Sequence, residues 1–272
     1  MSSPNRAKAA ATIGVFGGSG FYQWLEQVES VTVDTPYGPP SAPVAIGTLA
    51  GRRVAFMPRH GLHHEIPAPN VRYQANVWAM RELGVRRLLA PCAVGSLRPE
   101  LHPGDLVICD QFIDRTWGRG DTYYRGPEVV HISSADPYCA ELRPLAAAVA
   151  AEQRLRHQPA GTIVVVQGPR FSTRAESRWF SRMGWDVVGM TQYPEVILAR
   201  ELEMCYLNLS LVTDYDAGLE ADPKVAAVQA HDVMRVLAEN VSTVRALLAA
   251  LIPRIPERPS CTCQTALAGA KL

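Results

Sequence analysis

Two carboxylates separated by a single residue are the feature of this sequence best suited to chemistry. Asp214 ends the stretch 205–214, whose apolar run is typical of a buried strand, and Asp216 follows two positions later. Side chains two apart on a strand share a face, so both carboxyl groups could address one ligand. Ligands of open α/β sheets bind outside the carboxyl ends of the strands. The pattern therefore predicts a site that exchanges protons with a bound ligand.

A glycine-rich turn could hold an anion near the same edge. Gly17-Gly18-Ser19-Gly20 directly follows the strand-like stretch 11–16. It does not match the dinucleotide pattern G-x-G-x-x-G, because Gln23 occupies the last position, and it lacks the lysine of a P-loop. Its backbone N–H groups and the Ser19 hydroxyl suit a phosphate, whereas an ordinary glycine turn is the alternative.

A basic segment supplies a second candidate for anion binding. Arg59 and His60 follow the strand-like stretch 53–58. A guanidinium forms bidentate hydrogen bonds to phosphate, and an imidazole beside it adds a donor. With His63, His64 and Glu65 the segment could also be a metal site or a solvated loop, but the spacing fits no metal motif.

Three other strand ends carry residues that could contact a planar ligand. In the segment 167–173, Phe171 could stack on a base with Ser172 beside it; the alternative is a hydrophobic staple before the helix N-cap Thr173. Met190 and Thr191 end a short strand over 186–190. The stretch 92–97 ends the strand expected from residue 87 and has small residues that permit close approach of a ligand.

Strand-like and helix-like stretches alternate along the chain, which predicts one α/β domain. We expect an antiparallel pair over 43–49 and 53–58, further strands over 87–92, 105–110, 162–167, 186–190 and 205–214, and helices over 70–84, 173–183, 195–203 and 223–251. Residues 1–10 are expected to be a flexible lead, residues 11–256 the domain, and residues 257–272 a C-terminal tail.

Composition narrows the classes of function. The chain has 272 residues, 47% hydrophobic, and a net charge of +1, which gives no case for binding nucleic acid or an acidic membrane. The start lacks a signal-peptide core, so we expect a cytoplasmic protein. Four of the six cysteines, Cys92, Cys109, Cys139 and Cys205, are expected in the core. Cys261 and Cys263 indicate either a redox or disulfide role or a mobile, incidental tail. No other Cys or His pair lies near them in the sequence, so we expect no metal site there.

In this order, the motifs resemble the methylthioadenosine phosphorylase branch of the trimeric purine nucleoside phosphorylases. The similar stretches are 17–22, 58–61, 94–97, 110–116, 168–177, 189–191 and 213–216, and the resemblance runs from about Thr12 to Ile255. It implies a single-domain phosphorylase fold with a mixed central sheet flanked by helices. It also implies a homotrimer or a hexamer of trimers, with phosphate as co-substrate and no cofactor.

The resemblance assigns roles residue by residue. It places phosphate against Ser19, Arg59, His60, Cys92, Ala93 and Thr191. It places the base against Phe171 and the ribose over Met190, with Asp214, Asp216 and Ser172 as the catalytic groups at the polar edge of the base. It puts His131 and the loop 118–126 near a subunit contact, where a neighbouring chain would complete the sugar pocket.

Departures from the family pattern leave the substrate open. Cys92 stands where relatives often have threonine, and a thiol is a weaker hydrogen-bonding partner. The segment 221–230 is longer than in relatives, so Ala230, Val233 and Met234 are our candidates for a roomier 5′ pocket. The expected reaction is phosphorolysis of 5′-methylthioadenosine. The alternatives are another 5′-modified nucleoside such as methylthioinosine or a 5′-halogenated one, a 6-oxopurine nucleoside, or a nucleoside-binding protein without turnover.

Overall fold

The computed structural model describes residues 11–17, 25–217 and 227–272. The N-terminal lead, Ser19 with most of its glycine-rich turn, and part of the lengthened segment 221–230 lie outside the described residues. The expectations for these segments stay predictions.

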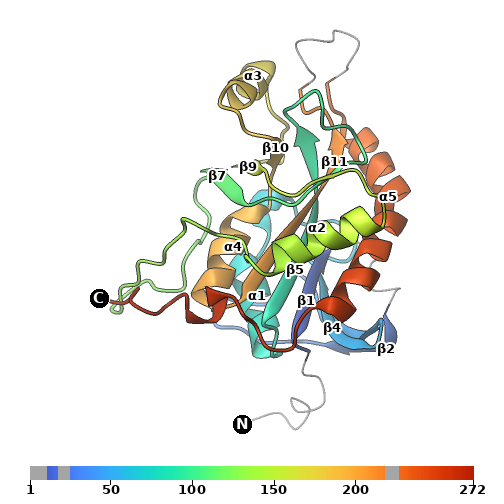
Figure 1. The fold of residues 1–272 in the computed structure, drawn as a ribbon. Helices are drawn as coiled ribbons and strands as arrows, with labels where there is room; N and C mark the ends of the chain where they lie inside the picture. Colours follow the sequence, from blue (N-terminus) through green and yellow to red (C-terminus); the bar gives the residue numbers. More distant parts are fainter. Residues whose placement is uncertain (1–10, 18–24, 218–226) are drawn as a thin grey trace.

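Among the described residues, one 11-stranded mixed sheet forms the centre of the molecule (Figure 1). The main path runs β2-β3-β4-β1-β5-β10-β9-β7, and β11, β6 and β8 continue from the other side of β5. The strands are β1 Ile13–Gly17, β2 Glu26–Val31, β3 Val44–Leu49, β4 Arg52–Pro58, β5 Arg87–Ser96, β6 Leu106–Val107, β7 Gln111–Arg115, β8 His157–Gln158, β9 Thr162–Val166, β10 Val187–Gly189 and β11 Cys205–Asp214. The expected mixed α/β fold is confirmed.

The long strands β5 and β11 form the axis of the sheet. They pair in parallel over nearly their whole length, from Cys205 opposite Arg87 to Leu211 opposite Ala93. Side chains of β11 alternate between two cores: Leu207 and Leu209 pack on one face, and Tyr206 on the other. A strand buried on both faces reads as a continuous apolar run, which is why the sequence predicted it correctly.

Helices cover both faces of the sheet (Figure 1). Helices α1 (Tyr73–Glu82) and α4 (Gln192–Glu201) contribute to one core, and α2 (Leu142–Glu152) and α5 (Ala230–Leu251) to the other. Helix α3 (Arg174–Arg182) begins with the expected capping box between Thr173 and Glu176. Helix α5 is long and apolar enough by length and composition to cross a membrane. Its Leu247, Leu248 and Leu251 are nevertheless buried in the core, as in helices of globular proteins.

Some expected elements were wrong in extent, and others were not foreseen. The strand expected over 105–110 contains only the two residues of β6. The edge strands β2 and β7 were missed because their side chains are partly or wholly exposed and show no buried alternation. Helix α2 was missed as well, although its alanine-rich sequence favours a helix.

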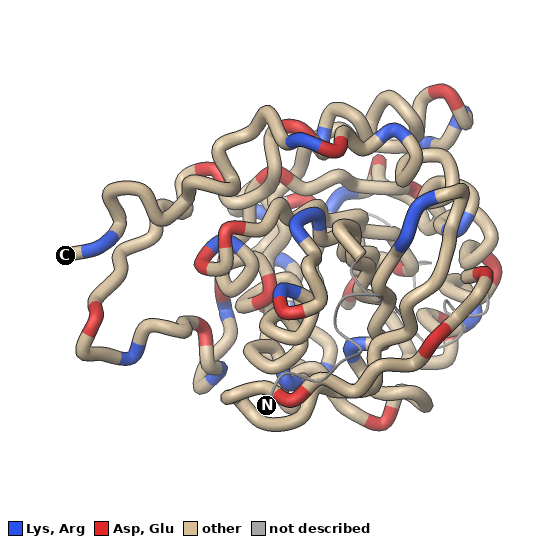
Figure 2. The backbone as a smooth tube through the Cα atoms, turned by 90° about the horizontal axis from the view of Figure 1, so that it is seen from below, with Lys and Arg blue, Asp and Glu red and all other residues tan. Residues whose placement is uncertain are grey.

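The C-terminal tail lies against the protein and then beside a distant loop. Cys263 is 6% exposed, so the expectation of an incidental tail was wrong. The end of the chain reaches the loop around residue 130, where Ala270 O accepts from His131 N and Leu272 N donates to Val129 O. Figure 1 shows the C-terminus next to this loop, away from the sheet. Figure 2 shows acidic and basic residues interspersed along the backbone.

Candidate active site

A cavity of about 610 Å³ collects nearly all of the predicted site residues. It opens beside the ends of β4, β9, β10 and β11 and the C-terminal half of β5, with the start of α5 along one wall. The predicted residues that line it are Arg59, His60, Cys92, Ala93, Phe171, Ser172, Met190, Thr191, Asp214, Asp216, Ala230, Val233 and Met234. The residues predicted from the strand ends therefore meet at one edge of the sheet.

The two carboxylates reach the cavity by different routes. Asp214 is the last residue of β11, and a register shift after Val212 sets it opposite Gly95 of β5. Asp216 lies beyond the strand in a left-handed conformation, with φ of 47°. The expected reason, a shared face of one strand, was thus wrong. A bulge and a tight turn bring the pair together, and the Asp216 N–H donates to Asp214 Oδ1 at 2.8 Å.

Gly95 permits the close approach of β5 to this turn. A Cβ atom there would lie 2.9 Å from Asp214 Oδ1 and 3.1 Å from Asp216 Cα. These distances are too short for a side chain, so a residue without Cβ is required at this position.

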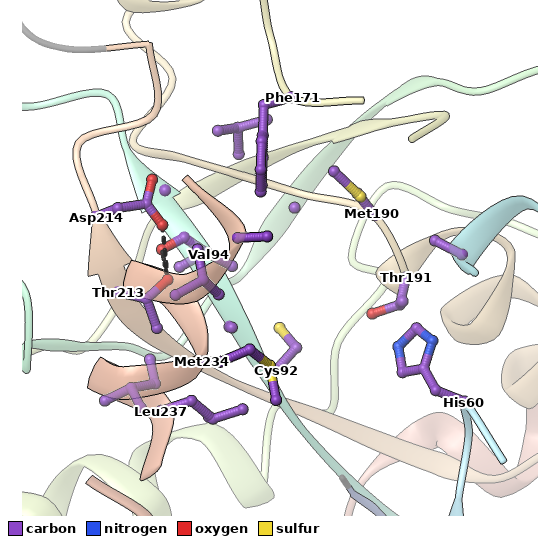
Figure 3. A pocket seen from close by; sticks show the side chains of 18 of the residues that line it. His60, Cys92, Val94, Phe171, Met190, Thr191, Thr213, Asp214, Met234 and Leu237 are labelled. Carbon is purple, nitrogen blue, oxygen red and sulfur yellow. Dashed lines mark hydrogen bonds between the residues drawn. The ribbon is translucent and has the colours of Figure 1, made fainter. Parts of the chain in front are cut away.

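Burial makes Asp214 a candidate proton donor. Burial raises its pKa to about 6, and the nearby charge of Asp216 acts in the same direction. The Thr213 hydroxyl donates to Asp214 Oδ2 at 2.7 Å, which orients the carboxyl group (Figure 3). The carboxyl group can thus hold a proton near neutral pH and release it to a ligand atom.

Polar atoms without partners lie beside the carboxyl pair. Asp216 is 3% exposed, and burial raises its pKa as well. Within the described part of the chain, Asp216 Oδ2 and Ser172 Oγ are buried without a hydrogen bond of ordinary geometry, although the Ser172 and Ser177 hydroxyls lie close enough to the Asp216 carboxyl group to oppose the rise of its pKa. Buried polar atoms are rarely left unpaired, so both are available for a polar ligand. The Phe171 side chain extends into the same cavity (Figure 3).

The opposite side of the cavity contains a buried ion pair. Arg59 is 3% exposed, and its guanidinium donates to both oxygens of Glu195, at 2.8 and 3.1 Å, and to the Pro91 carbonyl at 2.9 Å. Although burial opposes its charge, the Glu195 carboxylate raises the pKa of Arg59 above its usual value. Tyr206 also donates to Glu195 at 2.6 Å. These bonds use three of the five guanidinium N–H groups, so two are left for an anion.

His60 is held as a neutral ring. Burial and the charge of Arg59 lower its pKa to about 4. Its Nδ1 lies 2.8 Å from the Ile66 carbonyl, which can only accept, so Nδ1 carries the proton and Nε2 is an acceptor. Figure 3 shows His60 beside Thr191, across the cavity from Asp214. Thr191 precedes α4, and its hydroxyl makes no capping hydrogen bond to the helix.

Cys92 differs from its neighbours in this part of the cavity. Asn208 and Gln192 donate to its Sγ at 3.4 and 3.5 Å, and Ser210 lies 3.5 Å away. Burial raises the pKa of the thiol, so it is neutral. Cys92 therefore lines the cavity beside Ala93 with its sulfur already engaged by polar groups of β11 and α4.

The wall formed by α5 is apolar. Val233, Met234, Leu237 and Val241 line it, and Met234 is 49% exposed. Ala230, at the start of the helix, is exposed as well. The cavity is therefore open on this side, where the sequence predicted a roomier pocket.

His131 lies apart from the cavity within this chain. It lies on the loop that the C-terminus contacts and is not among the lining residues. A role for His131 in substrate binding therefore requires a neighbouring chain.

Sequence reasoning missed two residues that position the site. Glu195 reads as an ordinary helix residue, yet it is fully buried and pairs with Arg59. Arg119 donates to the carbonyls of Met190 at 2.8 Å and Gln167 at 2.9 Å, and thereby ties the loop 118–126 to two strand ends. No local pattern signals either role. The only hints were that Arg119 stands between two glycines and that Glu195 follows a predicted strand end.

Comparisons with known proteins agree with this geometry. Residues 12–253 match the model of the phosphorylase superfamily. The chain belongs to that superfamily. It is 51% identical to a purine nucleoside phosphorylase of Streptomyces coelicolor, with 96% of each chain covered. It is 54% identical to an S-methyl-5′-thioadenosine phosphorylase of Pyrococcus furiosus, with 94% of this chain and 97% of the relative covered.

A solved structure supports the same placement within the phosphorylase superfamily. A methylthioadenosine phosphorylase from an antarctic soil metagenomic library superposes with a TM-score of 0.90 at 40% identity, covering 97% of this chain and 93% of its own. The resemblance to the methylthioadenosine phosphorylase branch is thereby confirmed.

Proposed function

We propose that the protein cleaves 5′-methylthioadenosine with inorganic phosphate to give adenine and 5-methylthioribose 1-phosphate. The observation that carries this proposal is that one cavity joins a protonatable carboxyl pair, a buried arginine with N–H donors to spare beyond its pairing with Glu195, and an apolar wall. These match the three parts of the substrate pair: a basic purine, a phosphate and a thioether. Relatives that are 52–54% identical carry the corresponding name.

The chemistry divides between the two sides of the cavity. The C1′–N9 bond breaks, its electron pair leaves with the purine, and a phosphate oxygen bonds to C1′. Positive charge develops on the sugar and negative charge on the base, as in glycoside hydrolysis. Asp214 donates its proton to N7 of the departing base, and Asp216 accepts from the exocyclic amine. Ser172 completes this polar edge.

On the other side, Arg59 and Thr191 hold the phosphate through N–H and O–H donors. The neutral His60 accepts, through Nε2, from the remaining proton of the phosphate. Ser19 and Ala93 are proposed to add backbone or hydroxyl donors, whereas the sulfur of Cys92 contributes little. Fixing the nucleophile beneath C1′ accounts for a large share of the rate gain in such reactions. Phosphate is a co-substrate, and no cofactor is required.

A second candidate is a purine nucleoside phosphorylase with other substrates. It is favoured by the name of the Streptomyces coelicolor relative and by the exposure of Met234 at the apolar wall. A wider opening would admit a 5′ hydroxyl or a larger substituent. The carboxyl pair favours 6-amino over 6-oxo purines, so we rank adenine nucleosides first.

The test is the release of adenine from 5′-methylthioadenosine with and without phosphate. Release that depends on phosphate supports the proposal, and release without it would indicate a nucleosidase. The values of kcat/KM for 5′-methylthioadenosine, adenosine, inosine and methylthioinosine then rank the two candidates. Comparable values for inosine and 5′-methylthioadenosine would contradict the preference for a 6-amino group.

We also infer that the protein works in the cytoplasm as a homotrimer or a hexamer of trimers. The inference is supported by the position of His131, which can serve a cavity only in a neighbouring chain. Closed symmetry of this kind is common among soluble oligomers.

A further inference from the structure

Four cysteines from three distant parts of the chain converge outside the active site. Cys139 precedes helix α2, Cys205 begins β11, and Cys261 and Cys263 belong to the C-terminal tail. Their four Sγ atoms all lie within 4.8 Å of one another. The sequence argued against a metal because no second pair accompanies Cys261 and Cys263. The fold removes the premise of that argument, because it brings Cys139 and Cys205 beside this pair.

The spacing of the sulfur atoms fits a tetrahedral metal ion. Zinc–sulfur bonds of about 2.3 Å in a tetrahedron place the sulfurs about 3.8 Å apart. Cys261 Sγ lies 3.6 Å from Cys139 Sγ and 3.4 Å from Cys205 Sγ. All four thiols are free. Each disulfide would bring two sulfurs to about 2.05 Å, so two disulfides would divide the cluster into two pairs, whereas a single ion holds all four sulfurs around one centre.

A buried positive charge lies beside the four sulfur atoms. Arg87, which is 2% exposed, donates to Cys205 Sγ at 3.2 Å. Four thiolates around a divalent ion carry a net charge of −2, so a buried guanidinium beside them offsets part of that charge.

A second set of contacts holds the tail in place for this geometry. Arg87 donates to the Pro256 carbonyl at 3.2 Å and pairs with Glu141. Glu141 in turn accepts from the Ser260 hydroxyl at 2.7 Å and from its backbone N–H at 3.1 Å. Pro256 and Ser260 both lie within the five residues before Cys261. These contacts therefore fix the path along which the tail reaches the four cysteines.

We propose that Cys139, Cys205, Cys261 and Cys263 bind one structural Zn²⁺ ion. Binding replaces the thiol protons, which leave to solvent, and involves no change in oxidation state. All four positions are occupied by protein ligands, which is the pattern of a structural rather than a catalytic zinc site. The ion links the tail to β11 and α2, and the tail carries that link on to the loop of His131.

The test begins with the full-length protein, expressed with added zinc and purified under a reducing agent. We expect about one zinc per chain by elemental analysis. Exchange for Co²⁺ should give the thiolate charge-transfer bands and strong visible absorption of a tetrahedral sulfur site. The double variant Cys261→Ser/Cys263→Ser should lose the bound zinc. The matched control Cys109→Ser changes a buried cysteine outside the cluster and should keep it.

The outcomes separate clearly. Zinc near one per chain, lost only in the double variant, supports the site. A reduced wild-type protein that binds neither zinc nor cobalt overturns it. Mass spectrometry of protein trapped with alkylating agent at lysis overturns it too if these cysteines are joined in disulfides. If the double variant does not fold, the cobalt titration of the wild-type protein decides alone.

Discussion

At the scale of single residues, the protonation of Asp214 controls the proposed chemistry. A carboxylic acid with a pKa raised to about 6 can donate to a departing purine, whereas a carboxamide cannot supply that proton. We expect Asp214→Asn to lower kcat for 5′-methylthioadenosine by about 10²–10⁴-fold. Steady-state kinetics with saturating phosphate measure this. Wild-type turnover in Asp214→Asn would remove Asp214 from the mechanism.

The same group predicts a dependence on pH. Because the protonated form is the active one, the contribution of Asp214 to the rate is present below its pKa of about 6 and declines as the pH rises through it. The pKa of an unfolded aspartic acid is about 3.9, so the folded state holds the proton more tightly. The contribution of Asp214 to stability should therefore also fall as the pH rises from about 4 to about 6. Asp216, whose pKa is raised, adds a decline of its own, and His60, whose pKa is lowered, adds a rise. The difference between the wild type and Asp214→Asn, in pH profiles of activity and of urea unfolding, isolates the two declines that belong to Asp214.

Arg59 should affect phosphate more than the nucleoside. Arg59→Lys keeps the charge but loses the forked geometry that contacts both Glu195 oxygens and leaves N–H groups for an anion. We expect the KM for phosphate to rise about tenfold or more, with a much smaller change in the KM for the nucleoside, since one lost charged hydrogen bond costs about 1.5–3 kcal/mol. Arg254→Lys, at an exposed pair with Glu152, is the control. Equal changes in both KM values would contradict the assignment.

At the scale of elements, the site depends on how closely β5 approaches the end of β11. Gly95→Ala would place a Cβ atom 2.9 Å from Asp214 Oδ1, and relieving such crowding typically costs about 1–3 kcal/mol. We expect kcat/KM to fall about 10- to 100-fold, by displacement of both carboxylates. Gly38→Ala also replaces a glycine, but Gly38 does not line the cavity and nothing lies near its Cβ position; because its φ is 87°, the variant should lose some stability and keep its activity. Full activity in Gly95→Ala would show that the turn can adjust.

Elements also explain what the sequence could and could not predict. Phe171, Thr191 and Asp214 could be predicted as neighbours because they lie at or shortly after the ends of buried strands, and backbone direction alone brings strand ends together. Glu195 and Arg119 were missed because their roles depend on partners far along the chain, such as Arg59 and the Met190 carbonyl. The edge strand β2 was missed because its side chains face solvent, where no alternation of polarity is required.

At the scale of the whole molecule, the tail and the loop of His131 form one unit. Ala270 O accepts from His131 N, and Val130 pairs with Lys271. Neither segment lines the cavity of its own chain, so the role that we propose for His131 depends on assembly. The proposed zinc site would hold this unit to the sheet, and would thereby link the stability of the tail to the geometry of the proposed subunit contact.

Mixed oligomers test that arrangement. If His131 completes the sugar pocket of a neighbour, His131→Ala should raise the KM for the nucleoside, and Asp214→Asn should be nearly inactive. Co-expressed with different tags and purified as a mixture, the two variants should form some sites with an intact Asp214 and an intact His131 from the adjoining chain. The specific activity should then exceed the average of the two parent variants, because neither variant alone can form such a site. An activity equal to that average, in oligomers shown by both tags to be mixed, would place the function of His131 within its own chain or outside catalysis.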